Sequence, residues 1–159
     1  MPVMRQGNIM DWKIKTFDEL TAKELYDILK QRCEVFVVEQ NCPYPDIDGA
    51  DMKARQLFAY AGDGTLAASM RLLPAGVTYD AFAMGRVVVA NNFRGRGIAR
   101  EMMERAIDFA RNELGVTLIK IGAQEYLLSF YSSLGFKPVS EVYLEDGIPH
   151  VDMELKLAD

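Results

Sequence analysis

The sequence contains few of the residues that build metal sites and covalent cross-links. Its 159 residues include one histidine, His150, and two cysteines, Cys33 and Cys42. The cysteines form no CxxC pair and have no histidine at a metal-ligand spacing, so the common zinc sites are excluded and we predict no metal. We expect both thiols to be reduced, because disulfides are rare in the cytoplasm.

Long apolar runs and an excess of basic residues are also missing. No segment approaches the roughly 18 consecutive apolar residues that suggest a membrane span, and residues 1–10 lack the apolar core of a signal peptide. These absences argue against a membrane protein and favour a cytoplasmic one. The net charge of −5 argues against nucleic acid as the main partner, because phosphate backbones favour a basic surface.

The chain is long enough for one domain with a single core. We expect residues 1–10 to be a disordered lead-in and residues 11–157 to form that domain. Within it, the spacing of apolar residues alternates between the period of strands and that of helices. The segment VFVV, residues 35–38, could extend the first helix or leave it, since β-branched residues are poor helix formers.

The predicted elements form a mixed, twisted sheet with helices on both of its faces. Thr21 and Glu24 make a capping box that starts the first helix, and an apolar stripe from Ile98 marks the second. The fold class is therefore α/β or α+β, in the order β-α-β-β-β-α-β-α-β-β. The predicted strands are 11–17, two runs within 56–73, 82–90, 116–123 and two around the turn EDGI; the predicted helices are the one from Thr21, 98–113 and 126–134.

A loop between a buried strand and an amphipathic helix carries the sequence RGRGIA, residues 94–99. Such a loop presents the free N–H groups and the positive dipole end of the helix to a ligand. Gly95 and Gly97 have no Cβ, so a phosphate could approach the backbone, and Arg94 and Arg96 add positive charge. The loop lacks the third glycine of a dinucleotide fingerprint and the Gly-Lys-Ser/Thr of a Walker A loop. A phosphate site and a plain basic turn both remain open.

A second candidate site is the acidic loop that follows the first helix. Glu39, Asp46, Asp48 and Asp51 could form a wall that attracts an ammonium group and helps to remove its proton, or they could lie on a solvated loop with the aspartates as turn formers. Tyr44, between two prolines, is a rigid aromatic lip or a packed loop residue. His150 invites a base role because histidine titrates near neutral pH, but its position after a turn equally suits a structural hydrogen bond.

Two segments together resemble the GCN5-related N-acetyltransferase (GNAT) superfamily. Residues 94–99 match its R/Q-x-x-G-x-G/A signature, and FYSSLGF, residues 130–136, is similar to its second cofactor segment. The resemblance implies that Tyr131 is a general acid and that Gln124 lies near the cofactor. It further implies that acetyl-CoA is bound by the backbone of the preceding strand, at Val87, Val88 and Val89, and by the loop residues Arg94, Gly95, Arg96, Gly97, Ile98 and Ala99.

Residues 32–51, 85–89 and 141–150 are similar to the ElaA-type branch of that superfamily. One departure is Gln56, near a place where this branch often has a histidine. The resemblance implies an acetyl-CoA-dependent N-acetyltransferase with an amine acceptor, leaves room for a homodimer, and places the cofactor where the sheet opens beside strand 82–90. The implied acceptor-side residues are Glu39 as a base and Asp48, Asp51, Tyr44 and His150 as substrate-binding groups.

Three other functions share parts of this pattern. A non-catalytic acyl-CoA sensor would keep the loop 94–99 but need no acid or base, so Tyr131 and the acidic loop favour an enzyme. A nucleotide-phosphate binder is disfavoured by the missing Walker lysine. An acyl-homoserine-lactone synthase has a related fold and an R-x-x-VF-type segment, and the intact loop argues against it.

Overall fold

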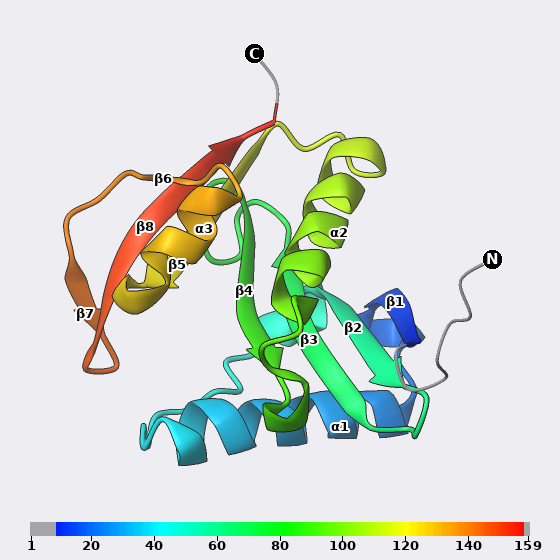
Figure 1. The fold of residues 1–159 in the computed structure, drawn as a ribbon. Coiled ribbons are helices and arrows are strands. Elements are labelled where there is room, and N and C mark those ends of the chain that lie inside the picture. Colours follow the sequence, from blue (N-terminus) through cyan, green and yellow to red (C-terminus); the bar gives the residue numbers. More distant parts are fainter. Residues whose placement is uncertain (1–8, 158–159) are drawn as a thin grey trace.

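The computed structural model describes residues 9–157, and within that range eight strands form one mixed sheet (Figure 1). The strands are β1 (Met10–Thr16), β2 (Arg55–Ala61), β3 (Leu66–Leu73), β4 (Phe82–Val89), β5 (Leu118–Gln124), β6 (Lys137–Pro138), β7 (Tyr143–Glu145) and β8 (Ile148–Lys156). Their order in the sheet is β1-β2-β3-β4-β5-β8-β6, and β7 pairs with β8. The α-helices in the same range are α1 (Ala22–Arg32), α2 (Ile98–Asn112) and α3 (Leu128–Ser133).

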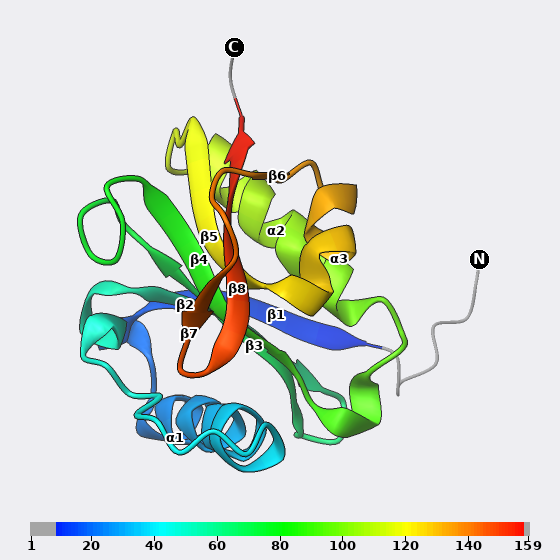
Figure 2. The same ribbon diagram turned by 90° about the vertical axis from the view of Figure 1, so that its left-hand side faces the viewer.

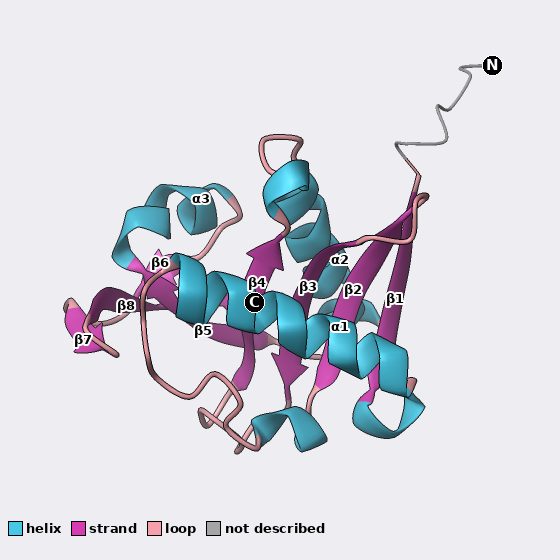
Figure 3. Cartoon of the chain, turned by 90° about the horizontal axis from the view of Figure 1, so that it is seen from below, coloured by secondary structure: helices cyan, strands magenta, loops and turns pink. Residues whose placement is uncertain are grey.

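The helices lie on both faces of the sheet, as predicted. Figure 2 shows α1 on one side of β1–β4 and α2 on the other, and Figure 3 shows α1 crossing the strands from below. Neighbouring residues of β2 explain this arrangement, because side chains along a strand point to alternate faces. Leu57 belongs to the apolar cluster of Met102 in α2, whereas Phe58 packs with Ile28 of α1. The strand therefore needs apolar residues on both faces.

Both long helices begin where the sequence indicates. The Thr21 hydroxyl accepts the N–H of Glu24, and the Glu24 carboxylate accepts the N–H of Thr21, which confirms the predicted capping box. α1 continues directly into a π-helical segment, Cys33–Glu39, so VFVV extends the helix. α2 begins after Gly97, whose φ of 76° is left-handed and suits glycine.

The sheet opens between its two parallel strands. β4 and β5 pair only at Phe82 with Ile119 and at Ala83 with Lys120, and beyond these pairs they diverge (Figure 1). β4 stays paired to β3, and β5 stays paired to β8, so each strand keeps a partner on its outer side. The predicted opening beside residues 82–90 is confirmed, and it divides the sheet into two halves that share a narrow junction.

A β-bulge bends β4 where it faces this opening. Ser69 pairs with Val88 and Arg71 pairs with Gly85, so two residues of β4, Arg86 and Val87, oppose one residue of β3. Arg86 has a φ of 51°, in the left-handed region that a residue with a side chain seldom adopts. Such a conformation costs roughly 1–3 kcal/mol and persists only where its surroundings hold it.

The C-terminal part differs from the prediction. The single strand expected after residue 135 is split into β6 and β7, because the Ser140 hydroxyl accepts the Asp152 N–H and so replaces a backbone partner. The last predicted helix begins as a 3-10 turn, Glu125–Leu127, before α3. Met10 is already in β1, while the remaining lead-in, residues 1–8, lies outside the described residues. The boundaries 11–157 for one domain stay a prediction.

Candidate active site

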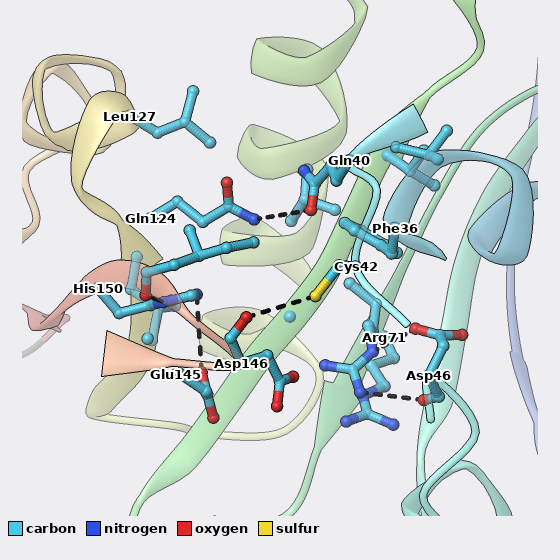
Figure 4. A pocket seen from close by; sticks show the side chains of 18 of the residues that line it. Phe36, Gln40, Cys42, Asp46, Arg71, Gln124, Leu127, Glu145, Asp146 and His150 are labelled. Atoms are coloured by element: carbon cyan, nitrogen blue, oxygen red, sulfur yellow. Dashed lines mark hydrogen bonds and ion pairs between the residues drawn. The ribbon is translucent and has the colours of Figure 1, made fainter. Parts of the chain in front are cut away.

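A cavity of about 900 Å³ occupies the opening between β4 and β5. Its walls come from the π-helical segment and the loop after it, from β4, from β5 and α3, and from the hairpin β7–β8 (Figure 4). Segments far apart in the sequence therefore meet here. Of the residues that sequence analysis singled out, the cavity is lined by Glu39, Tyr44, Asp48, Val87, Val88, Val89, Arg94, Gln124, Tyr131 and His150.

The backbone of β4 offers a hydrogen-bond donor to this cavity. The Ala90 N–H donates to the Ala67 carbonyl of the strand's partner at 2.8 Å. Successive residues in an antiparallel pair point their N–H groups alternately towards and away from the partner. The N–H of Val89 therefore points away from β3, into the side from which β5 has diverged. The Val89 carbonyl accepts a hydrogen bond from Arg94 Nε at 3.0 Å, which ties the following loop to the strand.

The loop 94–99 has the shape of a phosphate cradle. Gly95 and Gly97 have φ angles of 78° and 76°, and a Cβ added to either would meet no atom within 4 Å. The first N–H groups of a helix such as α2 have no partner within the helix and can bind an anion. Among the loop side chains, that of Arg94 lines the cavity, whereas Ile98 packs in the core and can offer only its backbone. The residues present fit a pyrophosphate.

Tyr131 lies on the wall formed by α3. Tyr131 is 7% exposed, and its ring packs edge-on against Phe130 and Phe136. Burial raises the pKa of Tyr131 to about 12, because an apolar environment disfavours the phenolate. The hydroxyl is therefore protonated at neutral pH and can donate a proton or a hydrogen bond into the cavity.

Glu39 and Gln124 each have a partner across the cavity. Glu39 Oε2 lies 3.1 Å from Arg94 Nη2, so this carboxylate is paired with the cradle arginine. Gln124 Nε2 lies 3.4 Å from Gln40 Oε1 (Figure 4). These two contacts join the end of the π-helical segment to both arms of the opened sheet.

The acidic loop after α1 is neutralised by three arginines. Asp46 binds Arg32 at 2.8 Å and Arg86 at 2.7 Å, Asp48 binds Arg71 at 2.7 Å, and Asp51 binds Arg32 at 2.6 Å. We call these six residues the Arg–Asp network. It connects α1, the loop, β3 and the bulge of β4, so it supplies the surroundings that hold the left-handed Arg86.

The Arg–Asp network keeps Asp48 and Asp51 ionised. Hydrogen bonds from Arg71 hold the pKa of Asp48 well below its usual range. Burial alone would raise the pKa of Asp51, but hydrogen bonds from Arg32 outweigh it and lower that pKa. Asp51 is 7% exposed and does not line the cavity. These carboxylates are thus neither a free acidic wall nor a solvated loop.

Sequence reasoning missed the arginines of this network, although one signal was visible. Arg71 stands in the strand LAASMRLL, every residue of which is buried. A charge inside such a run requires a buried partner of opposite sign, and the nearby DIDGAD segment could have been proposed as its source.

The hairpin β7–β8 forms the remaining wall. His150 is 8% exposed and stacks on Tyr143, with ring centroids 6.0 Å apart. The hydroxyls of Tyr143 and Tyr79 donate to Asp152 at 2.6 and 3.3 Å. Burial, and then the Asp152 carboxylate, raise the pKa of both tyrosines, so both stay protonated donors. The carboxylates of this wall are those of Glu145, Asp146 and Asp152.

Residues 9–157 show neither a metal-binding cluster nor a membrane-spanning helix. In that range, no group of three or more His, Cys, Asp or Glu side chains is placed to hold a metal ion. Nor does any helix of the described chain combine the length and apolar content needed to cross a membrane.

Known proteins are similar to this chain in both sequence and fold. The family model of the acetyltransferase (GNAT) domain matches residues 24–157. ElaA of Escherichia coli K12 is 39% identical over 147 residues, which cover 91% of this chain and 95% of ElaA, and its crystal structure matches with a TM-score of 0.86 over 93% of this chain and 100% of that one. A UPF0039 protein of Schizosaccharomyces pombe is 41% identical over 93% of this chain and 98% of its own length.

A second crystal structure, of an acyl-CoA N-acyltransferase from Pseudomonas aeruginosa, has a TM-score of 0.86 and 42% identity, covering 92% of this chain and 99% of that one. The family match of this chain covers residues 24–157, and this range includes the diverging strands β4 and β5 and the glycine loop at the start of α2. On this basis the chain belongs to the GNAT acetyltransferase family, and it is an acyltransferase.

Proposed function

We propose that the protein transfers an acetyl group from acetyl-CoA to an amine by direct attack. The observation that carries this proposal is the cavity between β4 and β5, which is lined by Val89 and by the buried phenol of Tyr131 and is bordered by Arg94 of the glycine loop. Family membership supplies the acyl-CoA donor. The cradle, Val89 and Tyr131 supply groups suited to its phosphates, its thioester carbonyl and its thiol.

In the proposed reaction, the neutral amine uses its lone pair to form a bond with the thioester carbon. Negative charge then develops on the carbonyl oxygen, and the N–H of Val89 is suited to stabilise it. When the carbon–sulfur bond breaks, Tyr131 gives its proton to the departing sulfur, while the former amine nitrogen loses its extra proton to solvent and becomes the amide nitrogen; the Tyr131 phenolate then regains a proton from solvent. Its pKa of about 12 favours this role, because the group stays protonated until the sulfur becomes basic, and burial disfavours a thiolate as well.

The acceptor is proposed to be cationic before it reacts. Asp48 and Asp51 are paired with arginines, so the attraction has to come from Glu145, Asp146 and Asp152 on the hairpin wall. Lys120 Nζ is 3.9 Å from Asp152, at the outer limit of an ion pair. Tyr44, on the loop after the π-helical segment, and His150, on the hairpin, both line the cavity and are proposed as acceptor-binding residues.

Release of free CoA thiol, measured across a panel of primary and secondary amines, tests this function. We expect acetyl-CoA to bind to the protein alone and thiol to be released only when a suitable amine is present. Binding of acetyl-CoA without amine-dependent release would favour the alternative, a non-catalytic acyl-CoA sensor. Release without any amine would indicate hydrolysis and contradict transfer to an amine.

A further inference from the structure

His150 lies in the middle of the hairpin wall formed by β7 and β8. It lies on β8 and is the cross-strand partner of both Gln124 on β5 and Tyr143 on β7. The side chain is 10% exposed, and it lines the cavity. The stacked ring of Tyr143, inclined by 25°, holds the plane of the imidazole. The histidine is therefore a buried ring in a fixed orientation, with one edge open to the cavity.

One hydrogen bond decides which ring nitrogen carries the proton. His150 Nδ1 lies 2.7 Å from the backbone carbonyl of Ile148. A carbonyl oxygen can only accept, so Nδ1 must donate. In the neutral imidazole the lone pair is then on Nε2. The first residue of β8 thus fixes the tautomer in which Nε2 is ready to accept a proton.

The surroundings of Nε2 suit proton transfer. Glu145 Oε2 is 3.6 Å from Nε2, beyond a direct hydrogen bond but close enough to stabilise a positive imidazolium (Figure 4). His150 lines the cavity although its side chain is only 10% exposed, so access to this edge of the ring is from the cavity. An amine or a water molecule can therefore reach the lone pair.

Glu39, the other candidate for the base, is already paired with an arginine. Glu39 is paired with Arg94 of the cradle at 3.1 Å, so its charge is directed to the donor side of the cavity. We propose that His150, and not Glu39, is the general base of the reaction; this inference rests on the proposed transfer to an amine. An N–H bond of the ammonium breaks, its electron pair stays on nitrogen as the nucleophile, and the proton bonds to Nε2. The imidazolium then passes the proton to solvent beside Glu145.

Other titratable groups face the same cavity and belong in the interpretation of any pH profile. On the hairpin they are Tyr143, Glu145, Asp146 and Asp152. From the other walls they are Glu39, Cys42, Tyr44, Asp46, Asp48, Arg71, Tyr79, Arg86, Arg94, Tyr126 and Tyr131. Histidine side chains commonly change their charge between pH 5 and 8, so the origin of a rate change in that range is decided by measuring the titration of His150 itself.

The chain contains one histidine, so nitrogen NMR of the tag-free, ¹⁵N-labelled protein reports on His150 without any assignment step. The protonated and unprotonated ring nitrogens have widely separated shifts. Above the titration midpoint we expect the Nδ1–H form, with Nε2 unprotonated. A spectrum with the proton on Nε2 would overturn the proposal. This measurement needs no acceptor and no variant.

Kinetics with the best amine of the panel complete the test. At saturating acetyl-CoA, kcat/KM for the amine should fall tenfold per pH unit below the midpoint that NMR gives for His150. His150→Gln should lose this limb and about 10²–10⁴-fold of the rate at pH 8, with unchanged affinity for acetyl-CoA.

Three outcomes would overturn the inference. A limb that follows the pKa of the amine when the amine is changed would show that no protein base is used. A limb that survives in His150→Gln but disappears in Glu39→Gln would give the role to Glu39. If no amine releases thiol although acetyl-CoA binds, the proposed function fails as well, whereas the first two outcomes leave that function standing.

Discussion

Replacing Arg32 with methionine would test the Arg–Asp network directly. The Arg32 side chain is 1% exposed, with Nε 2.8 Å from Asp46 and Nη1 2.6 Å from Asp51. Methionine occupies much of the same space but donates no hydrogen bond. The two carboxylates, 7% and 9% exposed, would lose this partner while they remain buried.

The expected cost follows from that burial. Removing one partner of a buried ion pair costs about 3–5 kcal/mol, because the other charge stays desolvated. For a domain of this size that loss lowers Tm by about 6–20 °C. Lys30→Met is the matched control, since Lys30 is on the same helix and lies 3.9 Å from Glu34, with both side chains about 60% exposed. Such a pair contributes at most about 0.5 kcal/mol.

Urea unfolding followed by circular dichroism, at pH 7 and at pH 3, measures both variants. Arg32 lowers the folded-state pKa of Asp51, so its stabilisation is complete above the unfolded pKa of about 4 and is lost as the pH falls through the folded value. The deficit of Arg32→Met should therefore be largest at pH 7 and smaller at pH 3. Equal costs for the two variants, or a deficit that does not change with pH, would refute this reasoning.

Three further predictions concern the donor side of the cavity. Tyr131→Phe should lower kcat for thiol release by about 10²–10⁴-fold and leave the calorimetric affinity for acetyl-CoA unchanged; full kcat over a pH series would contradict the general-acid role. Gly97→Val should weaken acetyl-CoA binding, because valine strains a φ of 76° and crowds the phosphates. The control Gly64→Val, at a φ of 87° in the β2–β3 hairpin, should keep the affinity. Equal affinities of the two variants would argue against the cradle. Glu39→Gln should raise the affinity for acetyl-CoA by up to about fivefold, because it frees Arg94 from a partly exposed pair worth at most about 1 kcal/mol; a weaker affinity would contradict that account.

Periodicity and local motifs predicted the order of the elements well. The capping box at Thr21, the apolar stripe of α2 and the opening beside β4 all depend on residues close together in the sequence or on a family signature. The split between β6 and β7 escaped prediction, because it depends on one side chain, Ser140, that takes a backbone partner's place. A periodic pattern carries no information about such a local exchange.

The candidate site was predictable only in part for a related reason. Arg32 is 14 residues from Asp46, and Arg86 is 40 residues from it, so no local pattern relates them. Sequence analysis therefore interpreted the aspartates by themselves, as an acidic wall. The tautomer of His150 was equally out of reach, although the carbonyl that sets it belongs to Ile148, two residues away, because the turn geometry decides whether the two atoms meet.

The diverging strands have a consequence for how specificity in this protein can change. Under the proposed function, the donor on the β4 side would meet main-chain N–H groups and helix-start amides, which every amino acid except proline provides. The acceptor would meet side chains of the hairpin that line the cavity, such as His150, Tyr143 and Glu145. Side chains of β4 that point away from the cavity can therefore change with little effect on acyl-CoA, provided that the glycines of the loop are kept, whereas one change in the hairpin can alter which amine is accepted. The two halves of the reaction are thus free to evolve at different rates.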